Sequence, residues 1–329
     1  MKKYFLGICA IVFLSACSTK EVFEPEAVRG DWKKEQSIAS EIIDVAANIA
    51  LLDDRSALSK TSHISIDVPK SHRVIAKSDE WVITASIDGT TILTSTSDTS
   101  LQKNFELKKT LASANVSGNI LAVLFADNEM ALYDIDSQAV LFKEQGASAS
   151  VADSRIVPPY FMGGLVLFGT LDGKVIIVNS ELKKRLRTTI VSSEDNFNNV
   201  IYMTLLNNKI VAATPYKLLS MSQKDAREPY EIRNVAYDDE SIYITTKQGE
   251  LISMDSELQV NAKIKFSFAH FLGMISLGEK LYILEKEGYL IVVDKKSFDY
   301  DVYETDIGDD YVFVGENHFC VENRKITLE

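Results

Sequence analysis

Eight short apolar hairpins recur along this chain of 329 residues, and their spacing is the feature that most limits its fold. In each copy, turn-forming residues lie between two runs rich in β-branched and aromatic side chains, which is the local pattern of a hairpin. The clearest copy is LVLFGTLDGKVIIVN, which turns at Asp172-Gly173. The turns lie near positions 53, 88, 127, 172, 215, 248, 287 and 316, at spacings of 29 to 45 residues. Repeats of this length are typical of propeller blades with four strands each.

The number of blades depends on how residues 38–52 fold. Apolar residues recur there at helical spacing, which would give a short amphipathic helix and leave seven blades. The stretch VAANIALLDDRSALSKTS also aligns with VSGNILAVLFADNEMALYDID, and this favours strands. We therefore predict an all-β protein, a single closed β-propeller of eight four-stranded blades, with seven as the alternative. Because an unpaired sheet edge is a liability, we expect a strand near residues 36–40 to join the blade that contains residues 326–328.

The hairpin turns need backbone conformations with positive φ, which glycine adopts freely and asparagine tolerates. The second strand of several hairpins ends in an acidic or amide residue: Asp134, Asn179, Asp255 and Asp294. Such side chains bond the backbone of the turn that follows them. We interpret these residues as turn formers and not as a ring of metal ligands.

The N-terminus has the pattern of a lipoprotein signal. Lys2 and Lys3 precede an apolar run that is too short to span a bilayer, and the run ends in Leu-Ser-Ala-Cys. This string resembles the bacterial lipobox, which implies a signal peptide at residues 1–16 and lipid (palmitate) attached to Cys17. Ser18 follows in place of Asp, which implies sorting to the outer membrane. We assign residues 17–34 to the lipidated N-terminus and a linker, and residues 35–329 to the propeller.

The composition limits which partners the chain without its signal peptide can bind. Without residues 1–16, which contain two lysines and no acidic residue, the formal net charge falls from −12 to −14. An acidic body has no basic face for nucleic acid and is repelled by anionic headgroups, so membrane attachment would come from the lipid anchor only. No other run is apolar and long enough for a transmembrane helix.

The sequence shows no cluster of catalytic or metal-binding residues. The four histidines are scattered and no HExxH, GxSxG or phosphate-binding glycine loop is present. The acidic stretch Asp306–Asp310 lacks the alternating ligands of a calcium loop, so we interpret it as a solvated turn. Cys320 is expected to be a lone buried thiol. We predict a protein that is not an enzyme and that uses no cofactor and no metal.

The hairpins resemble the PQQ-type propeller repeat, which reads DGxVxALDxxTGxxxW. Asp172-Gly173-Lys174-Val175 and Gln248-Gly249-Glu250-Leu251 come near it, while the Thr-Gly pair and the closing Trp are missing throughout. With the lipobox, the layout resembles the BamB-like lipoproteins of the outer-membrane β-barrel assembly machinery. That resemblance implies a periplasm-facing scaffold that binds the POTRA domains of the barrel-inserting protein and unfolded barrel clients.

One insertion is a candidate for partner binding. Pro158 and Pro159 in VPPYFMGG should resist strand pairing and leave Tyr160, Phe161 and Met162 on a rim, or else these three enter the core of the next strand. The predicted function is a non-catalytic outer-membrane lipoprotein scaffold of barrel assembly. The alternative is an envelope or surface lipoprotein that binds host, glycan or appendage components.

Overall fold

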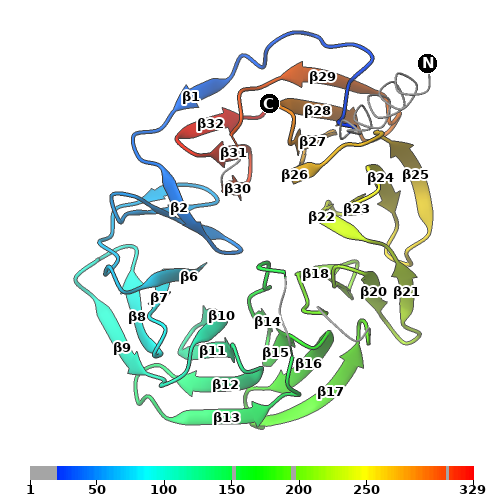
Figure 1. Cartoon of the computed structure of the whole chain (residues 1–329). Coiled ribbons are helices and arrows are strands. Elements are labelled where there is room, and N and C mark those ends of the chain that lie inside the picture. Colours follow the sequence, from blue (N-terminus) through cyan, green and yellow to red (C-terminus); the bar gives the residue numbers. More distant parts are fainter. Residues whose placement is uncertain (1–20, 150–152, 194–197, 309–310) are drawn as a thin grey trace, which may run out of the picture.

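The computed structural model describes residues 21–149, 153–193, 198–308 and 311–329. Within these residues the protein is all β, with eight four-stranded antiparallel sheets. The sheets are blades around a ring, and the first strand of each blade lies nearest the centre (Figure 1). The described chain contains no helix long and apolar enough to cross a membrane. The prediction of a single eight-bladed propeller is confirmed, and the seven-bladed alternative is wrong.

Blades 1 to 4 follow in chain order, and the strands of each run from the innermost to the outermost. Blade 1 has β2 (Ile42–Val45), β3 (Ile49–Leu52), β4 (Ala57–Ser59) and β5 (His63–Ile64). Blade 2 has β6 (Arg73–Ser78), β7 (Trp81–Ala85), β8 (Thr90–Ser95) and β9 (Gln102–Glu106). Blade 3 has β10 (Leu111–Ser117), β11 (Ile120–Phe125), β12 (Glu129–Asp134) and β13 (Val140–Gln145). Blade 4 has β14 (Tyr160–Met162), β15 (Leu165–Gly169), β16 (Lys174–Asn179) and β17 (Lys184–Ile190).

Blades 5 to 7 repeat the pattern, and blade 8 borrows its outermost strand. Blade 5 has β18 (Tyr202–Leu206), β19 (Lys209–Ala213), β20 (Lys217–Met221) and β21 (Ala226–Pro229). Blade 6 has β22 (Ile232–Tyr237), β23 (Ile242–Thr246), β24 (Glu250–Met254) and β25 (Val260–Lys265). Blade 7 has β26 (Phe271–Leu277), β27 (Lys280–Glu285), β28 (Tyr289–Asp294) and β29 (Tyr300–Glu304). Blade 8 has β30 (Val312–Val314), β31 (His318–Val321), β32 (Arg324–Thr327) and β1 (Glu35–Ser37).

The two ends of the chain close the ring in blade 8. β1 pairs antiparallel with β32, with Glu35 opposite Ile326 and Ser37 opposite Arg324. Both ends of this short ladder carry backbone hydrogen bonds, since the Thr327 amide donates to the Lys34 carbonyl (2.9 Å) and the Ile38 amide to the Asn323 carbonyl (2.7 Å). The predicted closure by an N-terminal strand is therefore confirmed.

One predicted turn proves to be of another kind. Seven of the eight predicted turns join the second and third strands of a blade, but the turn at Glu316-Asn317 joins the first and second strands of blade 8. The equivalent turn of that blade is Glu322-Asn323. The difference explains the short last spacing. β30 is only three residues long and directly precedes the turn at Glu316-Asn317. In the sequence, the hairpin of β30 and β31 therefore resembles the hairpin that the second and third strands form in the other blades.

Apolar contacts between neighbouring blades form the core. Eight clusters of buried side chains lie one at each blade-to-blade interface, including the seam between blades 8 and 1. Second strands such as β7 and β23 are buried along their whole length because both faces meet another blade. Outermost strands such as β25 alternate between exposed and half-buried residues. Cys320 is buried in the seam, as expected, and burial raises the pKa of its thiol to about 11.

The turns follow the predicted chemistry. Gly173 has a φ of +79°, and a Cβ there would lie 2.6 Å from the Ser192 carbonyl oxygen, so only glycine fits. The acidic and amide residues that end the third strands bond the next turn, as in Asp134, whose Oδ1 accepts from the Ser137 amide at 2.8 Å. Asn179 and Asp294 likewise accept from the amide three residues on, and Asp255 accepts from the amide two residues on. Their predicted role as turn formers is thus confirmed.

Where the PQQ-type pattern has glycine, this chain has larger residues in the same backbone conformation. Gln138, Lys183 and Phe298 lie four residues after Asp134, Asn179 and Asp294, and each has a φ between +52° and +60°. The left-handed backbone costs such residues on the order of 1 kcal/mol each. The repeat therefore keeps its turn geometry without its motif residue.

The segment assigned to a linker lies against blade 7 over part of its length. Phe23 is buried and makes edge-to-face contacts with Phe266 and Tyr289, at 6.0 and 5.7 Å between ring centroids. Further along, Asp31 forms a parallel bridge with Glu304 at the end of β29. We name residues 23–34 the N-terminal strap. The strap belongs to no blade, yet it is held by both apolar and backbone contacts.

We predict that His318 makes the protein less stable in mild acid. The imidazole is buried, and burial, with Lys325 nearby, lowers its pKa to about 4. The unfolded chain takes up a proton near pH 6.5, but the folded chain does not. Stability is therefore fully present above that pH and is lost as pH falls toward the folded pKa. Between about pH 6.5 and pH 5 the loss should be about 1.5 kcal/mol.

Urea unfolding at several pH values measures this loss. His318→Phe removes the titrating ring at similar volume and should flatten the profile in that window. His63→Phe changes an exposed ring and serves as the control. Equal pH dependence in wild type and His318→Phe would contradict the assignment.

Candidate interaction surface

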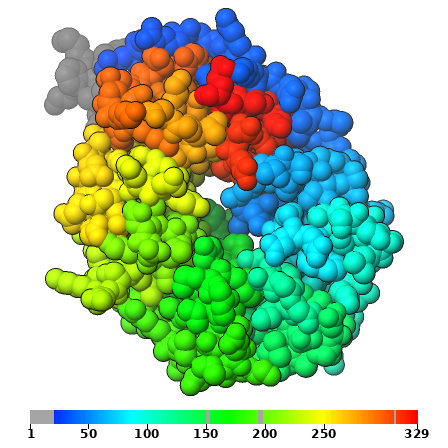
Figure 2. Space-filling model, turned by 180° about the vertical axis from the view of Figure 1, so that it is seen from behind, coloured from blue at the N-terminus to red at the C-terminus, as the bar shows by residue number. Residues whose placement is uncertain are grey.

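Strand direction sorts the loops of every blade onto two faces. Because neighbouring strands are antiparallel, second-to-third turns and the links between blades share one face, and the remaining turns share the other. We name the first the connector face. Its turns are residues 53–56, 86–89, 126–128, 170–173, 214–216, 247–249, 286–288 and 322–323. The ring is open at its centre, and side chains from the inner strands surround the opening (Figure 2).

The three predicted partner-binding residues form one short strand. Tyr160, Phe161 and Met162 make up β14, the innermost strand of blade 4, and all three are half-buried. Phe161 packs on the core between blades 3 and 4, and the other two pack on the core between blades 4 and 5. Pairing begins directly after Pro159, whose carbonyl accepts a hydrogen bond from the Asn115 side chain at 2.7 Å. These residues thus contribute to packing and keep exposed surface, and their part in binding stays a prediction.

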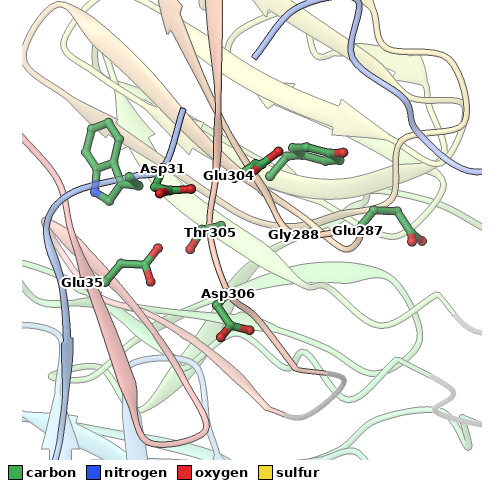
Figure 3. Close-up of a pocket in the computed structure, with 9 residues that line it drawn as sticks. Asp31, Glu35, Glu287, Gly288, Glu304, Thr305 and Asp306 are labelled. Atoms are coloured by element: carbon green, nitrogen blue, oxygen red, sulfur yellow. The ribbon is translucent and has the colours of Figure 1, made fainter. Parts of the chain in front are cut away.

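An acidic pocket lies on the connector face where the N-terminal strap meets blades 7 and 8. Its volume is about 490 Å³, and Trp32 and Tyr289 form part of its wall. Five carboxylates line it: Asp31, Glu35, Glu287, Glu304 and Asp306. Figure 3 shows Asp31, Glu35, Glu304 and Asp306 on different sides of Thr305.

Backbone and ring contacts hold the strap in this position. The Trp32 amide donates to the Glu304 carbonyl at 2.8 Å, and its indole Nε1 donates to the Thr327 carbonyl at 2.9 Å. The indole also meets the Tyr303 ring edge to face at 5.0 Å between centroids. Trp32 therefore anchors the segment that carries Asp31 and Glu35.

Few of the carboxylates in this pocket have a basic partner among the residues that the structure describes. Asp306 pairs with Arg324, but among the described residues no lysine or arginine forms an ion pair with the other four carboxylates. Burial raises the pKa of Tyr289, and the charge of Glu304 adds to that shift. Tyr289 thus experiences the negative potential of the pocket.

Among the described residues, two buried oxygens at this pocket have no hydrogen-bond partner. They are Oγ1 of Thr305, a residue only 8% exposed, and Oε1 of Glu35. A buried polar atom without a partner costs on the order of 1–3 kcal/mol. The arrangement suits an ammonium or guanidinium group with its positive charge.

No metal-binding cluster is found at this pocket within the described ranges. In the part of the chain that the structure describes, no group of three or more His, Cys, Asp or Glu side chains is close enough together to hold one. The acidic stretch at residues 306–310 is described only up to Gly308. His63, His72, His270 and His318 lie in or beside four different blades.

Sequence reasoning missed this pocket. Asp31 and Glu35 are more than 250 residues away from Glu287 and Glu304 in the chain, and they meet only because the ring closes. The one available sign was the number of acids in a segment taken for a linker. Cys17 and the signal peptide at residues 1–16 lie outside the described residues.

Comparisons with known proteins relate the chain to binding proteins by sequence. No family model matches the chain. The plasminogen-binding protein PgbB of Helicobacter pylori strain J99 is 36% identical over 209 residues, which is 62% of this chain and 39% of that protein. PgbB of strain 26695 gives a similar match of 36% over 210 residues. The matched part of the chain thus spans about two fifths of the length of these curated relatives.

Solved structures show the fold. BamB from Moraxella catarrhalis superposes with a TM-score of 0.63 at 13% identity, over 89% of this chain and 94% of that one. The C-terminal WD40 domain of Sif2 gives a TM-score of 0.66, also at 13% identity, over 90% and 98% of the two chains. At this level of identity the likeness shows a shared propeller fold and does not choose among propeller functions.

We predict that Tyr160→Ala combined with Phe161→Ala weakens partner capture and lowers the melting temperature by a few degrees. Complete loss of a buried aromatic costs about 3–5 kcal/mol, and these half-buried rings should cost less. Calorimetry and a pull-down on the same preparation measure the two effects.

Val166→Ala is the matched control. Val166 is fully buried on the adjacent strand β15, so its truncation lowers stability without altering the surface. If this control and the double variant lose capture equally, the rings act through stability and not through contact.

Proposed function

We propose that the chain is a non-catalytic protein-binding scaffold of the bacterial cell envelope. The observation that carries this proposal is its sequence similarity to proteins named for binding plasminogen, on a propeller that also superposes on BamB. The acidic pocket supports it, because unneutralised carboxylates beside a tryptophan are suited to a lysine or arginine side chain of a partner.

The first partner class is the outer-membrane β-barrel assembly machinery. Support comes from the BamB-like fold, from the lipobox and from the closed ring with its loop-bearing connector face. In this role the scaffold binds the POTRA domains of the barrel-inserting protein and holds unfolded clients nearby. Contacts of this kind come from loops, and loops are the parts that differ most between propellers.

The second partner class is a host protein such as plasminogen. The observation that favours it is the 36% identity to PgbB, a relationship in sequence, whereas BamB shares only 13%. The match covers 39% of PgbB, so the binding activity of that protein resides either in the matched part or in the remainder. Recovery of the barrel inserter and binding to plasminogen are separate measurements, and together they distinguish the two partner classes.

The attachment to the envelope is part of the same proposal. Cleavage before Cys17 and lipidation of its thiol would anchor the propeller in the outer membrane, facing the periplasm. Residues 17–22 then leave a short tether before Phe23, the first residue of the N-terminal strap. A propeller held this closely would work beside the membrane.

We predict that the intact lipoprotein, captured after mild cross-linking of whole cells, recovers the barrel-inserting protein. Deleting the gene should then lower the amounts of several barrel proteins at once. Glu35→Gln with Glu304→Gln should reduce the capture, because these changes remove two of the unpaired charges. Asp239→Asn with Glu240→Gln, two exposed acids on the opposite face, is the charge-matched control. The Cys17→Ala variant should lose both palmitate labelling and capture.

Each partner class has its own readout. Binding of the purified chain to immobilised plasminogen, without recovery of the barrel inserter and with normal barrel proteins in the deletion strain, supports the second class and refutes the first. Recovery of neither partner refutes both. Palmitate labelling that persists in Cys17→Ala would refute the proposed anchor alone.

A further inference from the structure

A second pocket on the connector face has the opposite charge. Its volume is about 450 Å³, and it lies beside the innermost strands of blades 6 and 7, β22 and β26. Its charged lining residues other than histidine are Arg155, Arg233, Lys247 and Asp153. Three cations against one carboxylate is unusual on a chain whose formal net charge is −12. A positive pocket on an acidic protein concentrates anions locally.

One wall of this pocket is a segment that reaches across the ring. Residues 153–155 precede blade 4, yet the Asn199 side chain beside blade 5 donates to the carbonyls of Asp153 (3.2 Å) and Arg155 (2.7 Å). Arg155 extends further and donates from Nη1 to the carbonyl of Arg233 in blade 6. Its Nε also donates to the Asp153 carboxylate at 2.8 Å. The Arg155 side chain is therefore occupied by contacts within the protein, and its charge is paired with that of Asp153.

Arg233 is in a different situation. Within the described chain its guanidinium has neither an ion pair nor a hydrogen-bond acceptor, although the residue is half-buried. Burial and the nearby charge of Arg155 lower the pKa of Arg233 by more than the charges of Asp153 and Glu231 raise it. Five N–H donors in a planar fork are thus available to a ligand.

Neighbouring side chains add charge and an apolar wall. Lys247 lies over the Tyr216 ring, with Nζ 5.4 Å from the centroid, and its nearest carboxylate, Glu231, is 3.7 Å away. Tyr216 and Leu272 line the pocket and are both half-buried. An anion bound at Arg233 would therefore have a second cation within reach and apolar surface beside it.

We propose that this pocket binds a carboxylate carried by a polypeptide next to an apolar side chain. Arg233 provides the bidentate fork, Lys247 adds charge, and Tyr216 and Leu272 contact the apolar side chain. A guanidinium matches the two oxygens of a carboxylate in geometry, and the charge-assisted pair strengthens when partly shielded from water. The apolar wall favours a peptide over inorganic phosphate. The site does not depend on which partner class binds the scaffold.

Calorimetric titration of the full-length lipoprotein in detergent tests the proposal with defined probes. The carboxylate has two possible sources. One is the C-terminus of a polypeptide, represented by acetyl-Leu-Phe with a free C-terminus, and the other is an acidic side chain, represented by acetyl-Leu-Glu-Leu amide. Acetyl-Leu-Phe amide and inorganic phosphate complete the set. We expect at least one carboxylate peptide to bind, and the amide without a carboxylate to bind at least about tenfold more weakly. Whichever carboxylate peptide binds identifies the source.

Variants of Arg233 separate the contribution of its forked hydrogen bonds from the contribution of its positive charge. Arg233→Gln should lower the affinity for the carboxylate peptide at least about tenfold. Arg233→Lys keeps the charge but loses the planar fork, so its affinity should lie between those of the wild type and Arg233→Gln. Arg185→Gln removes the same charge from the outermost strand β17 and should change nothing. Circular dichroism and the melting temperature confirm that each variant is folded.

Three results would overturn the proposal. They are unchanged peptide affinity in both Arg233 variants, equal binding of the amide and the free carboxylate, and binding of phosphate alone. Because the probes are peptides and not the cellular partner, failure of these titrations would leave the scaffold proposal untouched.

Discussion

Pairing of β1 with β32 is the interaction on which the rest of this structure depends. A propeller gains its core between blades, so an open ring would leave two apolar blade faces and a bare sheet edge in water. The seam between blades 8 and 1 buries five core residues, whereas the interface between blades 2 and 3 buries sixteen. Backbone pairing by residues 35–37 supplements this smaller contact. It also positions the N-terminal strap, whose Asp31 and Trp32 complete the acidic pocket.

Features that repeat along the chain could be predicted from sequence, because each depends only on neighbouring residues and occurs in several blades. The turn at Gly173, the capping residue Asp134 and the strand nature of residues 42–52 are of this kind. The candidate sites could not be predicted, since they arise where blades meet. Nothing in the sequence indicates that Arg155 reaches Arg233, 78 residues away. The misassigned turn at residues 316–317 has a local cause, because the first strand of blade 8 is only three residues long.

The two pockets give the connector face a charge pattern that the fold alone does not supply. One pocket presents carboxylates around Thr305 and the other presents Arg233 and Lys247, on opposite sides of blade 7 along the ring. Structural likeness to BamB and to a WD40 domain is nearly equal, so the propeller fold by itself does not indicate a partner. A polypeptide with both charges could contact both pockets, since rim charges set the specificity and rate of association.

Disulfide trapping across the closure tests the account most directly. Ser37 and Arg324 are opposite each other in β1 and β32, at a pair without mutual hydrogen bonds, where Cα atoms are about 4.5 Å apart and a disulfide fits. Ser37→Cys with Arg324→Cys should form an intramolecular disulfide under mild oxidation and raise the melting temperature. Ser37→Cys with Arg185→Cys should form none. A folded double variant at positions 37 and 324 that stays reduced would contradict closure of the ring by the N-terminal strand.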